Sequence, residues 1–460
     1  MTQTELARQL GISGSYLNLI EHNRRALGVD LLVKIAGILP IDIKSLAPDR
    51  GGRTVDELLE VFGDPVLENV DVIAQDVREL ATAYPTAAEA VVRLYEAFRA
   101  ARASAQDLAE TLSRDAGFGE AHPSRFPSEE VGDFIQQKMN YFPELEDAAD
   151  ALRRQANLNR DYIFVRLSDY LKRTADVKVR IEPTSRMQSA VRSYDPEAKV
   201  LLLSEGLRRG SRNFQLASQA GLITQGHLID RIMTDASLTT EGARTSCRVA
   251  LANYFAAAVL MPYDEFLNSA RKERYDIELL GHRFESSFEQ TCHRLAALRR
   301  PGAEGIPFHM LRVDIAGNMS KRFSASGLFI PRFTGACPRW NTFGAFLTPG
   351  MIRTQLSQMP DGQVFFGVAR TVGKESGGFS ATRPQYAIGL GCDVANAGGM
   401  VYADGLDLAS RDAVVPVGPS CRLCERMDCE QRAYPPLHSP FTVDENRRGV
   451  SFYAAPPPLK

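Results

Sequence analysis

Long apolar runs are missing from this chain of 460 residues. No stretch approaches the ~18 to 20 consecutive apolar residues that a membrane-spanning helix requires, and the N-terminus opens with polar helix formers instead of a basic-then-apolar signal region. An excess of charge is missing as well, because 54 basic and 56 acidic residues leave a formal net charge of -2. We therefore expect a cytoplasmic protein without a membrane partner, in which any nucleic-acid contact comes from a local basic patch.

Cysteine is scarce, at seven residues. Three of the seven form a run of spacing Cys-x2-Cys-x4-Cys at Cys421, Cys424 and Cys429. Three thiolates so close together can face one soft cation, whereas a disulfide would use only two of them. The run therefore predicts a metal or cluster site, against the alternative of three unrelated cysteines on a solvated loop. The other four are scattered, as reduced cytosolic thiols usually are: Cys247, Cys292, Cys337 and Cys392.

The cysteine run needs a fourth ligand. Cys392 is the favoured donor, because it follows a predicted strand and the 28 residues between it and Cys421 allow a returning strand to close the site. His438 is the second choice. A site of four thiolates could hold Zn²⁺ or an iron-sulfur cluster, and the spacing does not separate the two. Three basic side chains would offset the thiolate charge: Arg422, Arg426 and Arg432.

The first fifty residues carry the pattern of a helix-turn-helix. Apolar residues recur at helical spacing over residues 2–10, and Gly11 can end that helix. After a tight turn, Ser13 can cap a second helix. A third helix follows over residues 31–39 and is stopped by Pro40. Together the three helices would enclose a small core.

The framework of this segment resembles the xenobiotic-response-element type of repressor helix-turn-helix, at Thr2-Gln3-x-Glu5-Leu6-Ala7, Gly11-x-Ser13, Ile20-Glu21 and Leu32-x-x-Ile35-Ala36. The resemblance implies double-stranded DNA as a partner. It places Gln3 and the segment from Ser13 to Asn18 against the DNA, with Ser15, Tyr16 and Asn18 at base edges and Arg24 and Arg25 at phosphates. The alternative is a helical hairpin used only for packing. That family has a helix before this pair, so we expect the first helix of the domain to be missing.

The local charge of the helix-turn-helix is weak. Its five basic residues are opposed by four acidic ones: Arg8, Arg24, Arg25, Lys34 and Lys44 against Glu5, Glu21, Asp30 and Asp42. Useful DNA affinity would therefore need a homodimer or a higher homo-oligomer, which multiplies the phosphate contacts.

Helical periodicity dominates from Thr54 to Arg114, and Pro85 starts the second stretch. One apolar face of that stretch is either the buried side of an ordinary core helix or a dimer seam, formed by Ala87, Val91, Leu94, Phe98 and Ala101. Residues 115–128 are rich in glycine and proline and are interpreted as a linker.

Two further segments resemble the ImmA/IrrE-type zinc metallopeptidases. Residues 252–262 are similar to the family's Ala-Asn-x-Phe-Ala-Ala-x-Leu-Leu-Met-Pro helix, and residues 213–222 align with its Phe-x-Leu-Ala-His-Glu-x-x-His helix. The two ligand positions are held by Ser218 and Leu222, and the general-base position by Gln219. Zinc hydrolysis needs two imidazoles one turn apart and a carboxylate base, so the resemblance implies a peptidase fold without catalysis.

The combination of these parts resembles the short-chain fatty acyl transcriptional regulators, bacterial repressors and activators of acetate and propionate metabolism. Residues 337–340, 359–363 and 390–392 match the C-terminal domain of that family, and the resemblance covers nearly the whole chain. It implies that the middle domain senses a short-chain acyl-CoA, and it favours a [4Fe-4S] cluster over structural zinc.

A CoA ligand would demand cations for three phosphates. No Gly-rich phosphate loop is present, so the cations would have to come from single basic side chains. Basic residues crowd the middle of the chain, although most such side chains lie on a solvated surface. We take five as candidates for the ligand site: Arg166, Lys172, Arg173, Arg208 and Arg209.

After Pro301 the chain changes to short apolar runs separated by glycine and proline. Four of these runs predict strands of an antiparallel or mixed sheet: residues 327–331, 342–347, 363–369 and 386–390.

Together these patterns predict a multidomain α+β protein. An all-α helix-turn-helix domain that lacks its first helix occupies residues 1–48, and a helical linker or dimerisation region occupies residues 49–128. A degenerate, zincin-like peptidase domain that acts as the sensor spans residues 129–300. A C-terminal mixed α/β domain with the cysteine cluster spans residues 301–460.

The predicted function is a sequence-specific DNA-binding regulator of short-chain fatty acid metabolism, controlled by an acyl-CoA and by an iron-sulfur cluster. One alternative is a redox- or metal-sensing transcription factor with a vestigial acyl site. The other is an active zinc metallopeptidase, against which Ser218, Gln219 and Leu222 argue. We therefore expect a protein that is not an enzyme.

Overall fold

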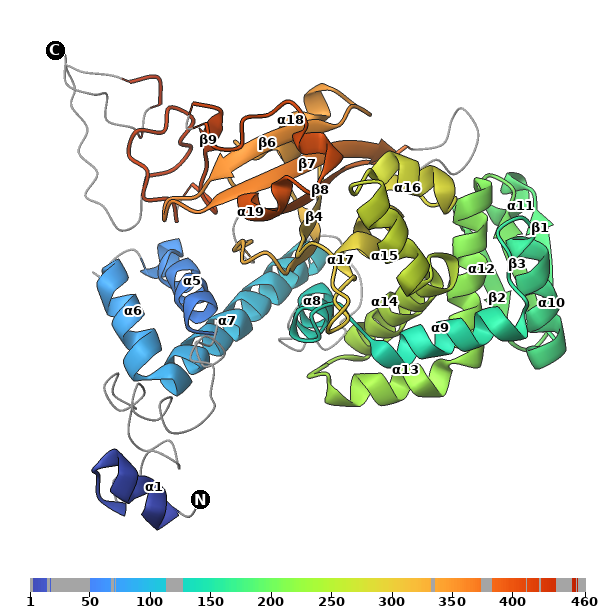
Figure 1. Ribbon diagram of the computed structural model, residues 1–460, viewed down its shortest axis with the longest axis horizontal. Helices are drawn as coiled ribbons and strands as arrows, with labels where there is room; N and C mark the ends of the chain where they lie inside the picture. The colour runs from blue at the N-terminus through green and yellow to red at the C-terminus, as the bar shows by residue number, and fades with distance from the viewer. Residues whose placement is uncertain are drawn as a thin grey trace.

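The computed structural model describes residues 3–14, 17, 50–67, 70, 72–112, 127–331, 336–373, 383–410, 412–421, 423–435, 449–451 and 453. Figure 1 shows a small N-terminal helix, a group of three helices, a mostly helical middle domain and a C-terminal sheet. This is the multidomain α+β architecture expected from the sequence. Among the described helices, none is both long enough and apolar enough to cross a membrane.

The N-terminal helix α1 spans Gln3–Leu10. Ala7 and Leu10 are buried with Leu17 in a small core. Gly11 follows at φ +70°, a left-handed conformation that glycine adopts at low cost, so the predicted helix end is confirmed. The backbone of Gln3 and the residue Ser13 are described. The other predicted DNA contacts lie outside the described residues: Ser15, Tyr16, Asn18, Arg24 and Arg25.

Three helices follow: α5 (Arg50–Phe62), α6 (Ala74–Ala83) and α7 (Pro85–Leu112), with the 3-10 turn η1 (Pro65–Leu67) after α5. This confirms the helical periodicity of the segment and the start of the long helix at Pro85. Their shared core consists of Leu58, Val61, Val77, Ala81, Ala88, Val92 and Tyr95.

Most of the predicted apolar face of α7 points away from this core, and only Val91 packs against its edge. Leu94 is 72% exposed and Phe98 is 40% exposed. The residues that do pack inward, Ala88, Val92 and Tyr95, each follow a residue of that face by one position. The interpretation of the face as the buried side of a core helix is therefore wrong.

The middle domain packs its helices around α12 and α14, which contact each other along their lengths. Its first helix begins at Pro127, so the linker predicted over residues 115–128 ends sooner than expected. The helices are α8 (Pro127–Gln137), α9 (Pro143–Gln155), α10 (Ile163–Ala175), α11 (Thr184–Met187), α12 (Arg209–Thr224), α13 (Gly226–Ile232), α14 (Glu241–Leu260), α15 (Tyr263–Lys272), α16 (Ile277–Arg283) and α17 (Phe288–Ala296), with the 3-10 turn η2 (Met233–Asp235).

A three-stranded sheet lies at one end of this domain. Its order is β1-β3-β2, in which β1 (Lys178–Glu182) runs parallel to β3 (Val200–Ser204) and β2 (Arg192–Asp195) runs antiparallel to it. Figure 1 shows α10 beside these strands, at the far side of the domain from the C-terminal sheet.

The C-terminal domain is built on a six-stranded sheet of order β5-β4-β8-β7-β6-β9. All neighbours are antiparallel except β6 and β9, which are parallel. The strands are β4 (His309–Asp314), β5 (Met319–Ser324), β6 (Arg353–Gln358), β7 (Val364–Gly373), β8 (Gln385–Asp393) and β9 (Val414–Pro416). Four short helical turns join them: α18 (Asn341–Gly344), η3 (Ala345–Leu347), α19 (Val394–Ala397) and η4 (Val401–Ala403).

The two faces of this sheet belong to different cores. Successive residues of a strand point to opposite faces. Phe366 of β7 and Cys392 of β8 therefore pack toward the helices of the middle domain, in a core that includes α15 and α17. Phe365 points to the other face, where it joins Cys337 and Trp340.

Two of the four predicted strands are confirmed, since residues 363–369 and 386–390 fall mainly in β7 and β8. The other two are wrong. Residues 342–347 form α18 and η3, and residues 327–331 form no strand. A short apolar run does not distinguish a strand from a buried helical turn, and here the run packs on the sheet instead of extending it.

Candidate functional site

A cavity of ≈ 1800 Å³ opens where the middle domain meets the C-terminal sheet. One side of it is formed by α8, α12, α14, α16 and α17, and the other by β4, β5 and β7. Pockets for drug-sized ligands usually enclose about 300 to 1,000 Å³. The cavity can therefore take a larger molecule, or a molecule that bridges the two domains.

The residues at the peptidase ligand and base positions stand on α12 behind the cavity wall and do not line it. Ser218, at the first ligand position, is fully buried and donates a hydrogen bond to Oδ1 of Asn253 at 2.9 Å. Gln219 is also buried, and Leu222 packs against the domain core. In the part of the chain that the structure describes, no group of three or more His, Cys, Asp or Glu side chains is placed to hold a metal ion.

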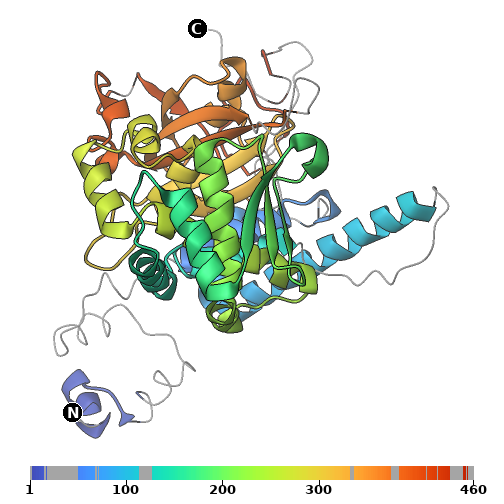
Figure 2. The same cartoon turned by 90° about the vertical axis from the view of Figure 1, so that its right-hand side faces the viewer.

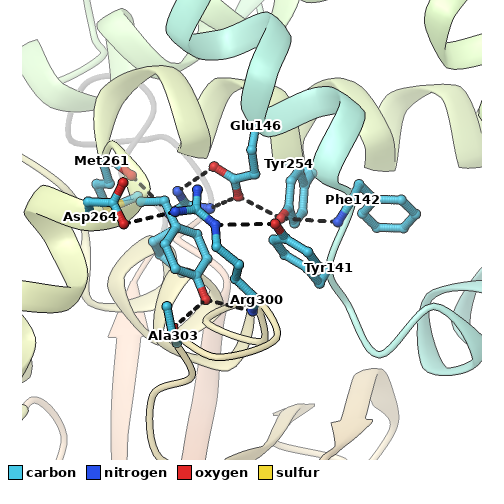
Figure 3. A network of polar contacts seen from close by, with 10 residues as sticks. Tyr141, Phe142, Glu146, Tyr254, Met261, Asp264, Arg300 and Ala303 are labelled. Atoms are coloured by element: carbon cyan, nitrogen blue, oxygen red, sulfur yellow. Dashed lines mark hydrogen bonds and ion pairs between the residues drawn. The ribbon is translucent and has the colours of Figure 1, made fainter.

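A buried ion pair lies behind the cavity, whose lining includes Arg294, and Figure 3 shows the polar network around it. Arg294 of α17 donates from Nη1 and Nη2 to the two oxygens of Glu146 of α9, at 2.6 and 2.9 Å, and from Nε to the carbonyl of Met261 at 2.9 Å. Tyr254 of α14 donates to the same carboxylate at 2.6 Å. Burial, followed by the charge of Glu146, raises the pKa of Tyr254 well above its usual value, so the hydroxyl stays a donor. Three helices are thus fixed around one carboxylate.

A second carboxylate, Glu289 of α17, is surrounded by cations on the sheet side of the cavity. Arg312 of β4 lies 2.8 Å from it and Lys321 of β5 lies 3.1 Å from it. Although burial alone would raise the pKa of Glu289, its neighbours His293, Lys321 and Arg312 hold that pKa well below the usual range. Burial and Lys321 lower the pKa of His293 to about 4, so this imidazole is neutral near pH 7.

Arg370 of β7 extends the cationic side of the cavity. Its guanidinium pairs with Glu278 at 2.6 Å and lies 5.4 Å from the centre of the Phe288 ring. Its buried Nε has no hydrogen-bond partner.

The charge along the cavity wall is positive. Seven basic side chains line it against four acidic ones, and His293, whose lowered pKa leaves it neutral, does not add to the sum. Such a surface favours an anionic ligand. The basic residues are Arg208, Arg209, Arg294, Arg312, Lys321, Arg322 and Arg370, and the acidic ones are Glu129, Glu278, Glu285 and Glu289.

Two of the five predicted ligand residues line this cavity. Arg208 and Arg209 stand at the start of α12, where Arg209 pairs with Glu285 at 3.2 Å. The other three do not line it: Arg166, Lys172 and Arg173.

These three side chains are exposed on α10, so they stay a prediction that this cavity does not support. Lys172 pairs with Asp176, and Arg173 donates to the carbonyl of Gln155 at 3.2 Å. The sequence reasoning missed Arg312, Lys321 and Arg370. Only recognition of β4 and β5 as a hairpin could have found the first two.

The cysteine run forms a loop that is held by one arginine. Arg432 is buried and donates from Nη1 to the carbonyl of Cys421 at 2.8 Å and from Nη2 to the carbonyl of Cys424 at 2.5 Å. Arg426 holds the same loop to the sheet through the carbonyls of Gln358 and Met359, each at 3.0 Å. Both arginines were expected near the cysteines.

The structure does not bring Cys392 to this loop. Its thiol lies 3.8 Å from the sulfur of Met400, in the core between the sheet and the middle domain. The thiol near the run is that of Cys337, whose backbone N–H donates to the carbonyl of Pro419 at 3.0 Å. The pKa of Cys337 is raised chiefly by burial, and the nearby Cys421 and Cys424 raise it further. Cys337 is therefore the better-placed fourth thiol. His438 lies outside the described residues.

The donor set of the loop suits a soft metal, but its geometry is not that of a finished site. Four thiols lie in this region, yet no three of them converge within the described residues. Burial raises the pKa of the Cys424 thiol above its usual value. The scattered Cys247 and Cys292 are fully buried and have raised pKa values, so they pack as small apolar groups.

Comparison with protein families divides the chain into three matched parts. A helix-turn-helix model matches residues 1–46. A model of the IrrE N-terminal-like domain matches residues 173–296. The model described as short-chain fatty acyl coenzyme A regulator, C-terminal, matches residues 297–453.

Several curated proteins are similar along nearly their whole length. The chain is 38% identical over 453 residues to a propionyl-CoA carboxylase regulator of Cereibacter sphaeroides, which covers 98% of this chain and 95% of that protein. It is 38% identical over 455 residues to the HTH-type transcriptional regulator RamB of Mycobacterium tuberculosis, and the match covers 98% of this chain and 95% of RamB. It is 38% identical over 448 residues to the regulator PrpR of the same species, and the match covers 97% of this chain and 91% of PrpR.

A solved structure is similar as well. A Mycobacterium tuberculosis transcriptional regulator superposes with a TM-score of 0.69 at 41% sequence identity, and the match covers 72% of this chain and 100% of that one.

Proposed function

The chain belongs to the short-chain fatty acyl coenzyme A regulator family, and from this premise we propose that a short-chain acyl-CoA bound in the cavity sets its affinity for an operator. The protein is a DNA-binding transcriptional regulator of short-chain fatty acid metabolism and not an enzyme. Its relatives, which match along nearly their whole length, are also named as regulators. Such a regulator works where the chromosome is, so we expect it in the cytoplasm.

The observation that carries the proposal is the size and charge of the cavity. An acyl-CoA has three phosphates, which need cations, and a short acyl chain, which needs an apolar surface. The side near β4, β5 and β7 supplies Arg312, Lys321 and Arg370, whereas Phe214 and Ala257 supply apolar surface near the ion pair of Arg294. We therefore place the phosphates at the sheet side and the acyl chain toward α14.

Control of DNA binding follows if the ligand favours one arrangement of the two domains. The cavity is shared between them, so a ligand that fills it contacts both sides at once. A difference of about 1 to 3 kcal/mol in ligand affinity between two arrangements is enough for regulation.

Helix α8 is the part of the cavity wall that lies nearest in sequence to the N-terminal helices. It lines the cavity through Val131 and Ile135 and is the first element described after α7. The side chain of Gln136 in α8 bonds to β5 twice, through the carbonyl of Ser324 at 2.7 Å and the N–H of Ser324 at 3.0 Å. A shift of β5 on ligand binding would therefore move α8.

We propose a homodimer as the DNA-binding form. The reason is the weak charge of the helix-turn-helix segment, which a second copy doubles.

For the cysteine loop we propose a [4Fe-4S] cluster held by thiolates of Cys421, Cys424 and Cys429, with structural zinc as the alternative. Arg426 and Arg432 support either choice, because they offset the charge of thiolate ligands. A redox-sensing transcription factor is the second candidate function, and the loop is the feature that favours it. Iron and sulfide analysis of protein prepared without oxygen distinguishes a cluster from zinc.

Calorimetric titration with propionyl-CoA, acetyl-CoA, free CoA and propionate tests the acyl-CoA proposal. We expect short acyl-CoA esters to bind and propionate alone to bind far more weakly, because propionate lacks the phosphates. Lys321→Met and Arg370→Gln should each weaken binding by about tenfold or more, since each removes a cation from the phosphate side. Lys172→Met is the matched control on the exposed side of α10 and should bind normally. Equal binding by all three variants would refute the placement.

A further inference from the structure

Helix α7 carries an apolar strip on its solvent side. Its 28 residues form a rod about 42 Å long at 1.5 Å per residue. Figure 2 shows its C-terminal half extending beyond the rest of the protein. Along the exposed side lie Ala87, Ala90, Leu94, Ala97, Phe98 and Ala101, and Val91 at the margin is half-buried.

The spacing along this strip is that of a coiled-coil seam. Ala87, Val91, Leu94, Phe98 and Ala101 are separated by steps of four, three, four and three residues. In heptad terms Val91 and Phe98 take a positions, and the other three take d positions. The sequence repeats the same steps at Ala105, Leu108 and Leu112. A helix that only covers a globular core does not need this strict repeat on its outer side.

Charge is absent from the strip over its described length. The charged residues of this part of α7 lie off it: Glu89, Arg93, Glu96, Arg99 and Arg102. Ala90 and Ala97, at the g positions beside the seam, are small enough to let a second helix approach closely. A solvent-facing helix surface normally carries charges, so this one has the composition of a covered surface.

Neighbouring residues enlarge the exposed apolar area. Of the 18 large hydrophobic side chains that are exposed in the described residues, six fall between positions 66 and 98. Apart from Leu94 and Phe98 they are Val66, Val70, Ile73 and Tyr84. Tyr84 stands one heptad before Val91, at the preceding a position.

We infer that this strip is the dimer seam: two copies of the chain pair α7 against α7 as a parallel two-stranded coiled coil. The assignment rests on the homodimer proposed above, and it names the surface that forms it. A second copy is the occupant that fits, because a heptad strip is complementary to another strip of the same repeat. The parallel direction puts both N-terminal DNA-binding segments at the same end of the pair, as recognition of two half-sites requires.

The test is the mass of the full-length protein in solution across a dilution series, measured by light scattering and sedimentation. We expect the unmodified chain to be a dimer. Leu94→Asp should weaken the dimer by about 100-fold or more, because it buries a charge in the centre of the seam. Leu94 is 72% exposed in one chain, so this change should leave the fold of the monomer intact. Leu347→Asp is the matched control, at a leucine 82% exposed in the C-terminal domain, and should stay dimeric.

A second variant tests the seam in the opposite direction. Ala87→Leu fills a d position without touching the core of the three helices, and we expect it to tighten the dimer by about tenfold. If the unmodified chain is a dimer but Leu94→Asp and Ala87→Leu both leave its affinity unchanged, the seam is elsewhere and the dimer proposal stands. If the unmodified chain is a monomer at every concentration, the seam and the homodimer both fail.

Discussion

Arg294 and Glu146 form a two-bond ion pair whose side chains are 0% and 4% exposed. The pair joins α9, near the start of the middle domain, to α17, the last helix before the C-terminal domain. Tyr254 and the carbonyl of Met261 satisfy further hydrogen bonds of the two groups. Because both charges are buried, each depends on the other: burial alone would lower the pKa of Arg294, but Glu146 raises it above its usual range. The inner end of the cavity is thereby kept rigid.

Removing one member of this pair should destabilise the middle domain. Arg294→Leu leaves a carboxylate buried without its partner, and we expect the free energy of unfolding to fall by about 3 to 5 kcal/mol. Replacing both residues by leucine should cost less than Arg294→Leu alone, because no charge is left unpaired. Denaturant unfolding followed by circular dichroism measures both. Arg93→Leu, which breaks an exposed pair with Glu89, is the control and should change stability by about 0.5 kcal/mol or less.

Asp56 of α5 should make the packing of the three N-terminal helices depend on pH. Burial, followed by the charge of Asp361 in the turn between β6 and β7, raises its pKa to about 7. The folded state therefore holds a proton that the unfolded chain releases at a lower pH. The protonated Asp56 therefore stabilises the folded state fully below the unfolded pKa of about 4, and this contribution to the free energy of unfolding is lost as the pH rises through about 7.

Asp56→Asn tests this dependence, since the amide keeps the shape and cannot ionise. We expect the variant to raise the melting temperature at about pH 8 by clearly more than at about pH 5. A melting temperature that shifts equally at both values would show that Asp56 does not titrate in this range.

Metal content should follow the cysteines of the loop. Replacing Cys421, Cys424 or Cys429 by serine should remove the metal and loosen the C-terminal domain, because thiolate ligation contributes to folding free energy. Cys337→Ser and Cys392→Ser test which thiol is the fourth ligand. Because Cys337 lies beside the loop, we expect only Cys337→Ser to lose metal. Cys247→Ser is the control with unchanged metal. Full metal retention by Cys424→Ser would overturn the site.

DNA recognition can be tested through two residues of the helix-turn-helix that lie outside the described residues. Asn18→Ala should weaken binding to the operator by about 1 to 3 kcal/mol and leave random DNA almost unaffected, because it removes a base-edge contact. Arg24→Ala should instead weaken binding to all sequences and reduce the salt dependence. Competition binding at several salt concentrations separates the two. An equal loss on both DNAs for Asn18→Ala would show that this residue does not contact bases.

The helices and the loss of peptidase chemistry were predictable because both depend on local sequence. The repeat of apolar residues predicted α1 and α7. Ser218 and Leu222 at the ligand positions and Gln219 at the base position argued against a zinc site. The exposed direction of the strip on α7 was not predictable, since a heptad strip and a core face have the same periodicity.

The cationic side of the cavity and the fourth cysteine depend on tertiary structure. Arg312 and Lys321 come together only because β4 and β5 pair in register, and these strands carry charged residues that hide their pattern. Cys392 was chosen for its distance along the chain from Cys421. Cys392 points to one face of the sheet and Cys337 lies on the other. Because a shift of one position in a strand reverses the face to which a side chain points, the sequence alone could not tell on which face Cys392 lies.

Hydrogen exchange with and without propionyl-CoA tests most directly whether the cavity is the ligand site. The ligand should protect α16, α17 and the β4–β5 hairpin, because these elements line the cavity on both of its sides. It should leave α10 unchanged, since Arg166, Lys172 and Arg173 lie outside the cavity. Protection of α10 without protection of α17 and β5, or no protection anywhere at a saturating concentration, would contradict the account.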